Sequence, residues 1–184
     1  MKGFIVIDLQ NDYLPKGNIP LVNVEESIKQ AATILNKVRE NEDYFVVHVR
    51  HEFEDENAPF LAKNSDGSKI VPIVENKGDE VVITKHHPNS FLETNLHEVL
   101  TSKGITDLTI VGAMAQTCVQ GTVRAASELG YNVTVVYDAV PARDLEFRGT
   151  VVPAKYVALT VFATLEFGYA KLLNTEEYLK HLQN

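Results

Sequence analysis

An acid, a base and a thiol each stand just after a predicted strand, and together they could carry out covalent chemistry on a carbonyl carbon. Asp8 and Lys85 each end a strand, and Cys118 lies six residues beyond Gly112, which ends another. A thiol with two polar helpers is expected for nucleophilic catalysis. Taken singly, the aspartate could cap a turn, the lysine could be solvated and the cysteine could be a small buried hydrophobe. Their convergence on one sheet edge favours the catalytic interpretation.

The position of Cys118 in the chain favours a reactive thiol. It opens a predicted helix, where the macrodipole and the free N–H groups stabilise a thiolate, and a neighbouring Lys85 would add to this effect. An activated Cys118 should react quickly with iodoacetamide below the ordinary cysteine pKa of ~8.5, whereas a structural cysteine should not. Replacing Asp8 by Asn should slow this alkylation, because the proton acceptor is lost.

Strands and helices alternate along the chain, which is typical of parallel βαβ units. Asn23 and Glu26 resemble a capping box, and residues 50–78 are predicted to form a long loop. Apolar runs predict strands over 4–9, 44–49, 81–84, 108–111, 133–137 and 170–173, and helical spacing predicts helices over 24–38, 91–100, 117–129 and 153–167, with a last one capped by Thr175. The sequence thus predicts one α/β domain over residues 1–184. Its architecture is a three-layer α/β/α sandwich with a Rossmann-like parallel sheet of about six strands, which binds ligands beyond the carboxyl ends of its strands.

Composition narrows the functional class. Lys and Arg number 17 against 25 Asp and Glu, which gives a net charge of −8. This charge is opposite to the basic footprint of a nucleic-acid or membrane-surface binder. One cysteine excludes an intrachain disulfide and suits a reducing compartment, and no apolar run has the length of a signal peptide or a membrane span. We expect a cytoplasmic protein that acts on a small molecule, with no nucleic-acid or membrane partner. Glycine-rich phosphate loops are missing from the sequence, so no nucleotide cofactor is predicted.

Three motifs in order resemble those of the isochorismatase-like cysteine hydrolases, a family that includes nicotinamidase-related amidohydrolases. Ile-Val-Ile-Asp-Leu-Gln-Asn-Asp at 5–12 resembles the opening motif, and Lys85 followed by Asn-Ser-Phe at 89–91 resembles the second. Ile-Val-Gly-Ala-Met-Ala-Gln-Thr-Cys-Val at 110–119 resembles the third. The resemblance extends from about residue 3 to residue 180, nearly the whole chain.

The resemblance implies a Cys-Asp-Lys triad. Cys118 would attack an amide-type carbonyl, and Asp8 would take the thiol proton and pass it to the leaving amine. Lys85 would hold Asp8 ionised, and water would then hydrolyse the thioester. The resemblance also implies a cis peptide bond between Ala113 and Met114. This bond would aim the N–H of Met114, with that of Cys118, as an oxyanion hole.

Departures from the family pattern refine this prediction. Authentic isochorismatases lack the cysteine at position 118, so its presence argues against vinyl-ether hydrolysis. Nicotinamidases carry an Asp-x-His metal motif where this chain has Val49-Arg50-His51, and Ala115 stands where the family often has threonine. No set of ligands at metal-binding spacing is present, so no metal is predicted. The histidines near the predicted strand ends are interpreted as rim or core residues, namely His48, His51, His86 and His87.

The sequence therefore predicts a cysteine hydrolase that cleaves a C–N bond of a small amide, carbamoyl or ureido compound. Two alternatives stay open: a nicotinamidase-type enzyme with a degenerate metal site, and a non-catalytic module that binds a small ligand. Arg143 or Arg148 could bind a carboxylate. An apolar stretch over 151–167 is broader than one sheet-facing stripe and predicts a homo-oligomer, and the family resemblance implies a dimer or tetramer. The predicted substrate-binding residues are Gln10, Phe53, Phe60 and Phe147.

Overall fold

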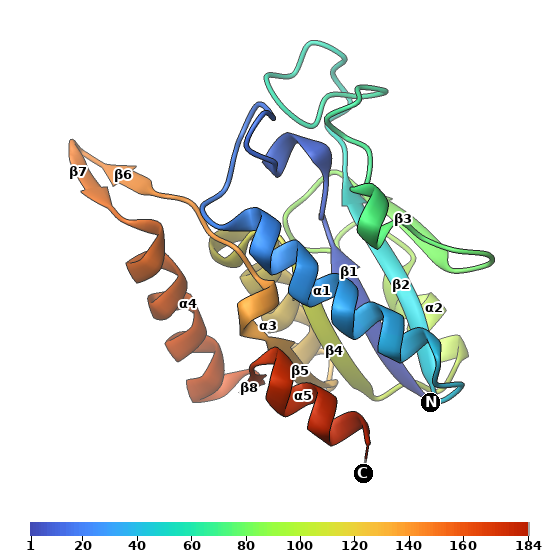
Figure 1. The fold of residues 1–184 in the computed structure, drawn as a ribbon. Coiled ribbons are helices and arrows are strands. Elements are labelled where there is room, and N and C mark those ends of the chain that lie inside the picture. The colour runs from blue at the N-terminus through green and yellow to red at the C-terminus, as the bar shows by residue number, and fades with distance from the viewer. Residues whose placement is uncertain (184) are drawn as a thin grey trace.

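Six parallel strands form the central sheet in the computed structural model, which describes residues 1–183 (Figure 1). The strand order is β3-β2-β1-β4-β5-β8. The strands are β1 (Lys2–Ile7), β2 (Tyr44–His51), β3 (Val81–Lys85), β4 (Asp107–Gly112), β5 (Asn132–Val136) and β8 (Lys171–Leu173). The predicted α/β fold with about six parallel strands is confirmed.

Helices cover both faces of this sheet (Figure 1). Along β1 the side chains alternate: Phe4 and Val6 pack on one face, and Ile5 and Ile7 pack on the other. The first face is covered by α1 (Val24–Arg39) and α5 (Thr175–Leu182), and the second by α2 (Leu96–Ser102), α3 (Gln120–Glu128) and α4 (Ala154–Gly168). Burial on both faces explains why β1 is apolar at every position from Phe4 to Ile7.

Asp12 fastens the long loop after β2 to the segment after β1. Its carboxylate accepts hydrogen bonds from the N–H of Asn18 at 3.1 Å, the Asn18 side chain at 2.8 Å and the N–H of Leu61 at 2.6 Å. A Cβ on Gly67 would lie 2.2 Å from the Asp12 carboxylate, so only glycine fits there. One buried carboxylate thus holds two loops together over the carboxyl edge of the sheet.

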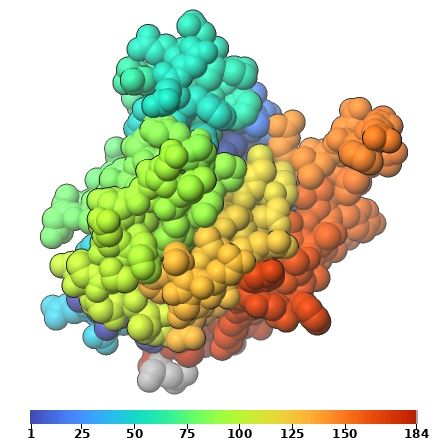
Figure 2. Space-filling view, turned by 180° about the vertical axis from the view of Figure 1, so that it is seen from behind, coloured from blue at the N-terminus to red at the C-terminus, as the bar shows by residue number. Residues whose placement is uncertain are grey.

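A two-stranded hairpin that the sequence did not predict stands out from the body of the molecule (Figures 1 and 2). It consists of β6 (Leu145–Phe147) and β7 (Thr150–Val152), and both strands are exposed along their whole length. Large apolar side chains are exposed on this hairpin and on the adjacent α4, namely Leu145, Phe147, Val151, Val152, Tyr156, Leu159 and Phe167.

Two predicted helix caps were wrong. Asn23 precedes α1 with a positive φ of 55°, and its side chain makes no capping hydrogen bond. The cap of α5 is Asn174 rather than Thr175: Asn174 accepts from the N–H of Glu177 at 2.8 Å, and the Glu177 carboxylate accepts from the N–H of Asn174 at 2.8 Å. The capping box therefore occurs at the last helix instead of the first.

The helix predicted from residue 91 begins only at Leu96. Side chains compete for the backbone ahead of it: Asn89 accepts from the N–H of Phe91 at 2.9 Å, and the Thr94 hydroxyl donates to the carbonyl of Ser90 at 2.6 Å. Such local bonds favour turns over helix.

Candidate active site

The chain turns sharply where β1 ends, and this turn positions Asp8. The residue adopts a left-handed conformation with φ 49°, and its N–H donates to the carbonyl of Val49 at 2.8 Å. Gly112, at the end of the neighbouring β4, has φ 130°, and a Cβ there would lie 2.0 Å from the carbonyl oxygen of Ile7. A non-glycine residue with positive φ is uncommon, and such residues cluster at functional sites.

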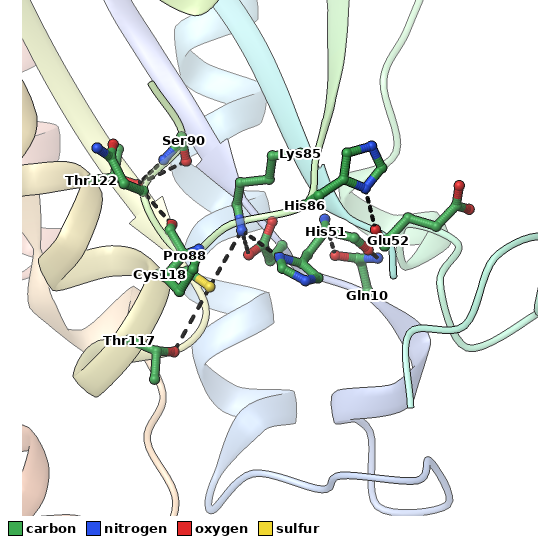
Figure 3. A network of polar contacts seen from close by, with 12 residues as sticks. Gln10, His51, Glu52, Lys85, His86, Pro88, Ser90, Thr117, Cys118 and Thr122 are labelled. Carbon is green, nitrogen blue, oxygen red and sulfur yellow. Dashed lines mark hydrogen bonds and ion pairs between the residues drawn. The ribbon is translucent and has the colours of Figure 1, made fainter. Parts of the chain in front are cut away.

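The ammonium of Lys85 contacts both of the residues predicted to act with it, and Figure 3 shows its contacts with Cys118 and His51. Lys85 ends β3 and is fully buried. Its Nζ lies 2.7 Å from Oδ2 of Asp8, 3.3 Å from Sγ of Cys118 and 3.0 Å from Nδ1 of His51. A lysine ammonium has three N–H donors, so these three acceptors use all of them. The structure therefore brings Asp8, Lys85 and Cys118 together and adds His51 to them.

Cys118 lies in a π-helical turn, Ala115–Val119, between β4 and α3. The residue is only 6% exposed. The segment after Lys85 is bound to α3 because the N–H of Ser90 donates to the Thr122 hydroxyl at 3.0 Å, and the two hydroxyls lie 2.8 Å apart (Figure 3). These bonds tie the strand end that carries the ammonium to the helix that follows the thiol.

The N–H of Met114, in the turn before the thiol, donates no backbone hydrogen bond within residues 1–183. The peptide bond between Ala113 and Met114 is cis. The carbonyl of Met114 accepts from the N–H groups of Thr117 and Val119. An unpaired N–H near a nucleophile is one of the donors that an oxyanion hole requires.

Burial and charge set the resting protonation state. Burial, followed by the negative charge of Asp8, raises the pKa of Cys118 to about 12. Burial raises the pKa of Asp8, although Lys85 opposes the shift. Burial alone would lower the pKa of Lys85, but the charges of Asp8 and Cys118 raise it. Cys118 is thus a neutral thiol at rest, beside the ion pair that Lys85 forms with Asp8 at 2.7 Å. This differs from the thiolate expected from the helix end.

Ligand-type atoms of Asp8, His51 and Cys118 all lie within 4.8 Å of one another, which resembles a metal-binding set. The ammonium of Lys85, however, contacts all three residues and supplies the positive charge that they surround. Burial, followed by the charge of Lys85, lowers the pKa of His51 to about 4, so the ring is neutral and Nδ1 accepts from Lys85. The cluster is therefore built around an ammonium and does not fit a second cation.

The other three histidines that lie near the predicted strand ends have partners outside the triad. His48 is buried and lies 2.9 Å from the carboxylate of Glu80. His86 contacts the backbone carbonyl of Glu52 at 2.6 Å, and His87 pairs with Glu93 at 2.9 Å. One is thus a core residue and two belong to the rim.

The predicted substrate-binding residues differ in where they lie. The amide of Gln10 is fully used: it donates to the carbonyls of His51 and Ser68 at 2.7 Å each and accepts from the N–H of His51 at 2.8 Å. Gln10 therefore supports the site instead of presenting a free group to a substrate. Phe53 packs edge-on against His51 at 4.7 Å and against Phe60 at 5.4 Å, so these two rings form a wall beside the cluster.

Phe147 does not lie beside the thiol. It is 72% exposed on the projecting hairpin, and the guanidinium of Arg148 lies 5.4 Å from the centre of its ring. The predicted contact with substrate is therefore not formed within this chain. Arg143 is half-buried near Tyr13, and its charge partly offsets the rise in the Tyr13 pKa that burial and Asp8 cause.

Sequence reasoning missed two residues of the site. Tyr13 is 3% exposed, and burial followed by the charges of Asp8 and Cys118 raises its pKa well above the usual value. His51 was interpreted only as a rim or core residue, although it contacts Lys85. A usable signal was present for Tyr13, because it directly follows the opening motif at 5–12.

Comparison with known proteins identifies the family. An isochorismatase domain model matches residues 2–152. The chain belongs to the isochorismatase family. Among its relatives, the uncharacterized isochorismatase family protein YddQ of Bacillus subtilis is 39% identical over 97% of this chain and 98% of its own length. The secreted isochorismatase effector Isc1 of Verticillium dahliae is 36% identical over 77% of this chain and 73% of its own.

Solved structures of the family share the fold. A putative isochorismatase hydrolase from Oleispira antarctica is 40% identical, with a TM-score of 0.92 over 100% of this chain and 96% of its own. N-carbamoylsarcosine amidase from Thermoplasma acidophilum has a TM-score of 0.82 over 96% of this chain and 98% of its own. Its sequence is 23% identical, so that likeness concerns the fold alone. The family model and the similar sequences identify the protein as an isochorismatase-family hydrolase.

Proposed function

We propose that this protein is a cysteine hydrolase that cleaves the C–N bond of a small amide, carbamoyl or ureido compound. The observation that carries the proposal is the ammonium of Lys85, which contacts both the carboxylate of Asp8 at 2.7 Å and the thiol of Cys118 at 3.3 Å. A proton acceptor, a nucleophile and a fixed positive charge within one buried cluster are the parts of an activated-thiol mechanism.

In the first half of the reaction Asp8 takes the proton of Cys118 as the sulfur attacks the carbonyl carbon. A C–S bond forms, and the charge on the oxygen is stabilised by the N–H groups of Met114 and Cys118. The raised pKa of Asp8 makes it a stronger base. Asp8 then gives the proton to the departing nitrogen, the C–N bond breaks, and an amine or ammonia leaves.

In the second half Asp8 takes a proton from water, and the oxygen of that water attacks the thioester carbon. The C–S bond breaks, the sulfur regains a proton from Asp8, and the acid product is released. Where that acid is a carbamic acid, it decomposes to carbon dioxide and an amine. No group other than water is consumed, and Lys85 keeps its charge throughout.

The test is an ammonia-release screen over primary amides, carbamoyl amino acids and ureido acids, with Cys118→Ala as the blank. We expect release by the wild type only, and intact-mass spectrometry of quenched turnover should show an acyl adduct on the single cysteine. Turnover by Cys118→Ala would overturn the proposal, as would tight binding of panel members without release of ammonia. The latter result would instead establish the non-catalytic binding module.

No observation favours the alternative of a nicotinamidase-type enzyme with a degenerate metal site, because an ammonium lies among the residues that would have to hold the metal.

We also propose that the protein is a cytoplasmic homo-oligomer. The exposed apolar side chains of the hairpin and α4 support assembly, since monomers rarely expose patches of this kind. The single cysteine supports a reducing location. Among residues 1–183, none of the helices combines the length and hydrophobicity needed to cross a bilayer.

A further inference from the structure

Sheet order places His51 between the base and the ammonium of the triad. β2 lies between β1 and β3 in the sheet. Asp8 follows β1 and Lys85 ends β3, so the lysine side chain has to pass the end of β2 to reach Asp8. His51 is the last residue of β2 and is the register partner of Lys85.

Several contacts hold the ring of His51 in place. The side chain of Gln10 makes two hydrogen bonds to the backbone of His51: it donates to the carbonyl at 2.7 Å and accepts from the N–H at 2.8 Å. Phe53 packs against the ring edge at 4.7 Å. Nδ1 faces the ammonium of Lys85 at 3.0 Å (Figure 3). Since Lys85 is a donor only, this contact requires Nδ1 to be the unprotonated nitrogen.

From this arrangement we infer that His51 is a positioning residue, whose Nδ1 lone pair holds the Lys85 ammonium where it can serve both Asp8 and Cys118. The ammonium has three donors, and two of them bind the reacting groups. Without a third acceptor, one buried N–H would be unsatisfied, which is costly and would draw the ammonium away from the sulfur. The inference rests on the proposed function, and it adds a fourth residue that acts through Lys85 instead of contacting substrate.

Two nearly isosteric substitutions test the acceptor itself. Asn presents a carbonyl oxygen near the place of Nδ1, whereas Leu presents a methyl group, and both remove the aromatic ring and Nε2. We measure the rate of alkylation of the single cysteine by iodoacetamide at pH 9, using intact mass. Alkylation should fall about tenfold in His51→Leu, which is a loss of about 1.4 kcal/mol, and His51→Asn should recover most of it. His181→Leu, at an exposed position in α5, is the matched control.

Equal alkylation rates in the Leu and Asn variants would overturn the inference. The same variants are assayed on the best substrate of the ammonia-release panel, where kcat should fall in His51→Leu while KM stays the same, because the residue acts through Lys85. A rise in KM with unchanged kcat would mean that His51 binds substrate, which also overturns it. Alkylation needs no substrate, so failure of the hydrolase proposal is distinguishable from failure of this one.

A measurement on the wild-type protein guards against variants that fail to fold. Nitrogen-15 NMR of the histidine rings, assigned by the signals that vanish in His51→Asn, reports which ring nitrogen carries the proton. We expect a neutral ring protonated at Nε2. A proton on Nδ1 at neutral pH would overturn the inference, because Lys85 could then not donate to it.

Discussion

Replacing Asp8 by Asn should separate the reactivity of Cys118 from turnover. The carboxylate has two opposed effects: in the proposed reaction it accepts the thiol proton, and its negative charge raises the pKa of the resting thiol. In Asp8→Asn the ammonium of Lys85 still needs a partner of opposite charge, and the sulfur 3.3 Å away is the group that can provide it. The structure thus reverses the expectation, drawn from the sequence, that this substitution slows alkylation.

The size of the effect follows from the distance. The reactive atoms of Asp8 and Cys118 lie within 4.8 Å of each other. At an effective dielectric constant of about 20, two charges at that separation interact by about 3.5 kcal/mol. This equals a fall of about 2.5 units in the thiol pKa. The thiolate fraction then rises by about 300-fold, and since nucleophilicity falls with pKa by a Brønsted factor of about 0.5, alkylation accelerates by about 20-fold.

The assay is iodoacetamide labelling at pH 7.5 followed by intact mass, which is unambiguous because the chain has one cysteine. Asp43→Asn, an exposed acid in the turn before β2, is the matched control. Ammonia release by Asp8→Asn should fall by about 10²–10⁴-fold, the usual contribution of general acid–base catalysis. Slower labelling of Asp8→Asn than of the wild type would refute the reasoning, and would show that proton transfer to the carboxylate limits formation of the thiolate.

Four further predictions concern the nucleophile, the buried ion pair, the oligomeric state and the loss of stability at low pH. Cys118→Ser should reduce ammonia release to background while the Tm stays near that of the wild type, because a hydroxyl is a much weaker acid than a thiol and does not yield its proton to Asp8. Lys85→Met should lower the free energy of unfolding in urea by about 3–5 kcal/mol at pH 8, because it leaves the charge of Asp8 buried and unpaired. The loss should shrink at pH 5, since burial raises the pKa of that carboxyl; equal losses at both pH values would contradict this. Leu159→Glu, on the exposed face of α4, should lower the mass measured by light scattering, and a wild type that is already monomeric at micromolar concentration would refute the proposed assembly. Burial raises the pKa of Glu80, but hydrogen bonds from the guanidinium of Arg39 outweigh this effect and lower the pKa to about 2. Its stabilising contribution should therefore be complete above pH 4.5 and be lost as the pH falls toward 2, and Glu80→Gln should lack this loss in a series of melts against pH.

The sheet and the three triad positions could be predicted because each depends on local sequence. Apolar runs at regular intervals predict parallel strands, and the carboxyl ends of parallel strands share one edge. Asp8, Lys85 and Cys118 could therefore be assigned to one edge before any contact was known. Their distances confirm that these side chains meet, while their roles in a reaction stay a prediction.

The remaining features depend on contacts between distant parts of the chain. The bond between His51 and Lys85 follows from the register of β2 and β3, which no local pattern encodes. Asp12 binds Leu61 across 49 residues. The hairpin Leu145–Val152 has strands of only three residues, too short for alternation to be recognised. The pKa of Cys118 follows from burial and a nearby carboxylate, and these outweigh the helix end that the sequence made visible.

The neutral thiol of the resting cluster has a consequence for survival of the protein under oxidative conditions. Thiolates attack peroxides and disulfides, and a cysteine that is oxidised without a neighbouring thiol proceeds to sulfinic and sulfonic acids that are not repaired. Cys118 is the one cysteine of the chain, so no second thiol can rescue it. Because burial and the charge of Asp8 raise the pKa of the thiol to about 12, the thiolate is scarce at neutral pH. In the proposed reaction the sulfur therefore stays in its less oxidisable form until a bound carbonyl draws the proton onto Asp8.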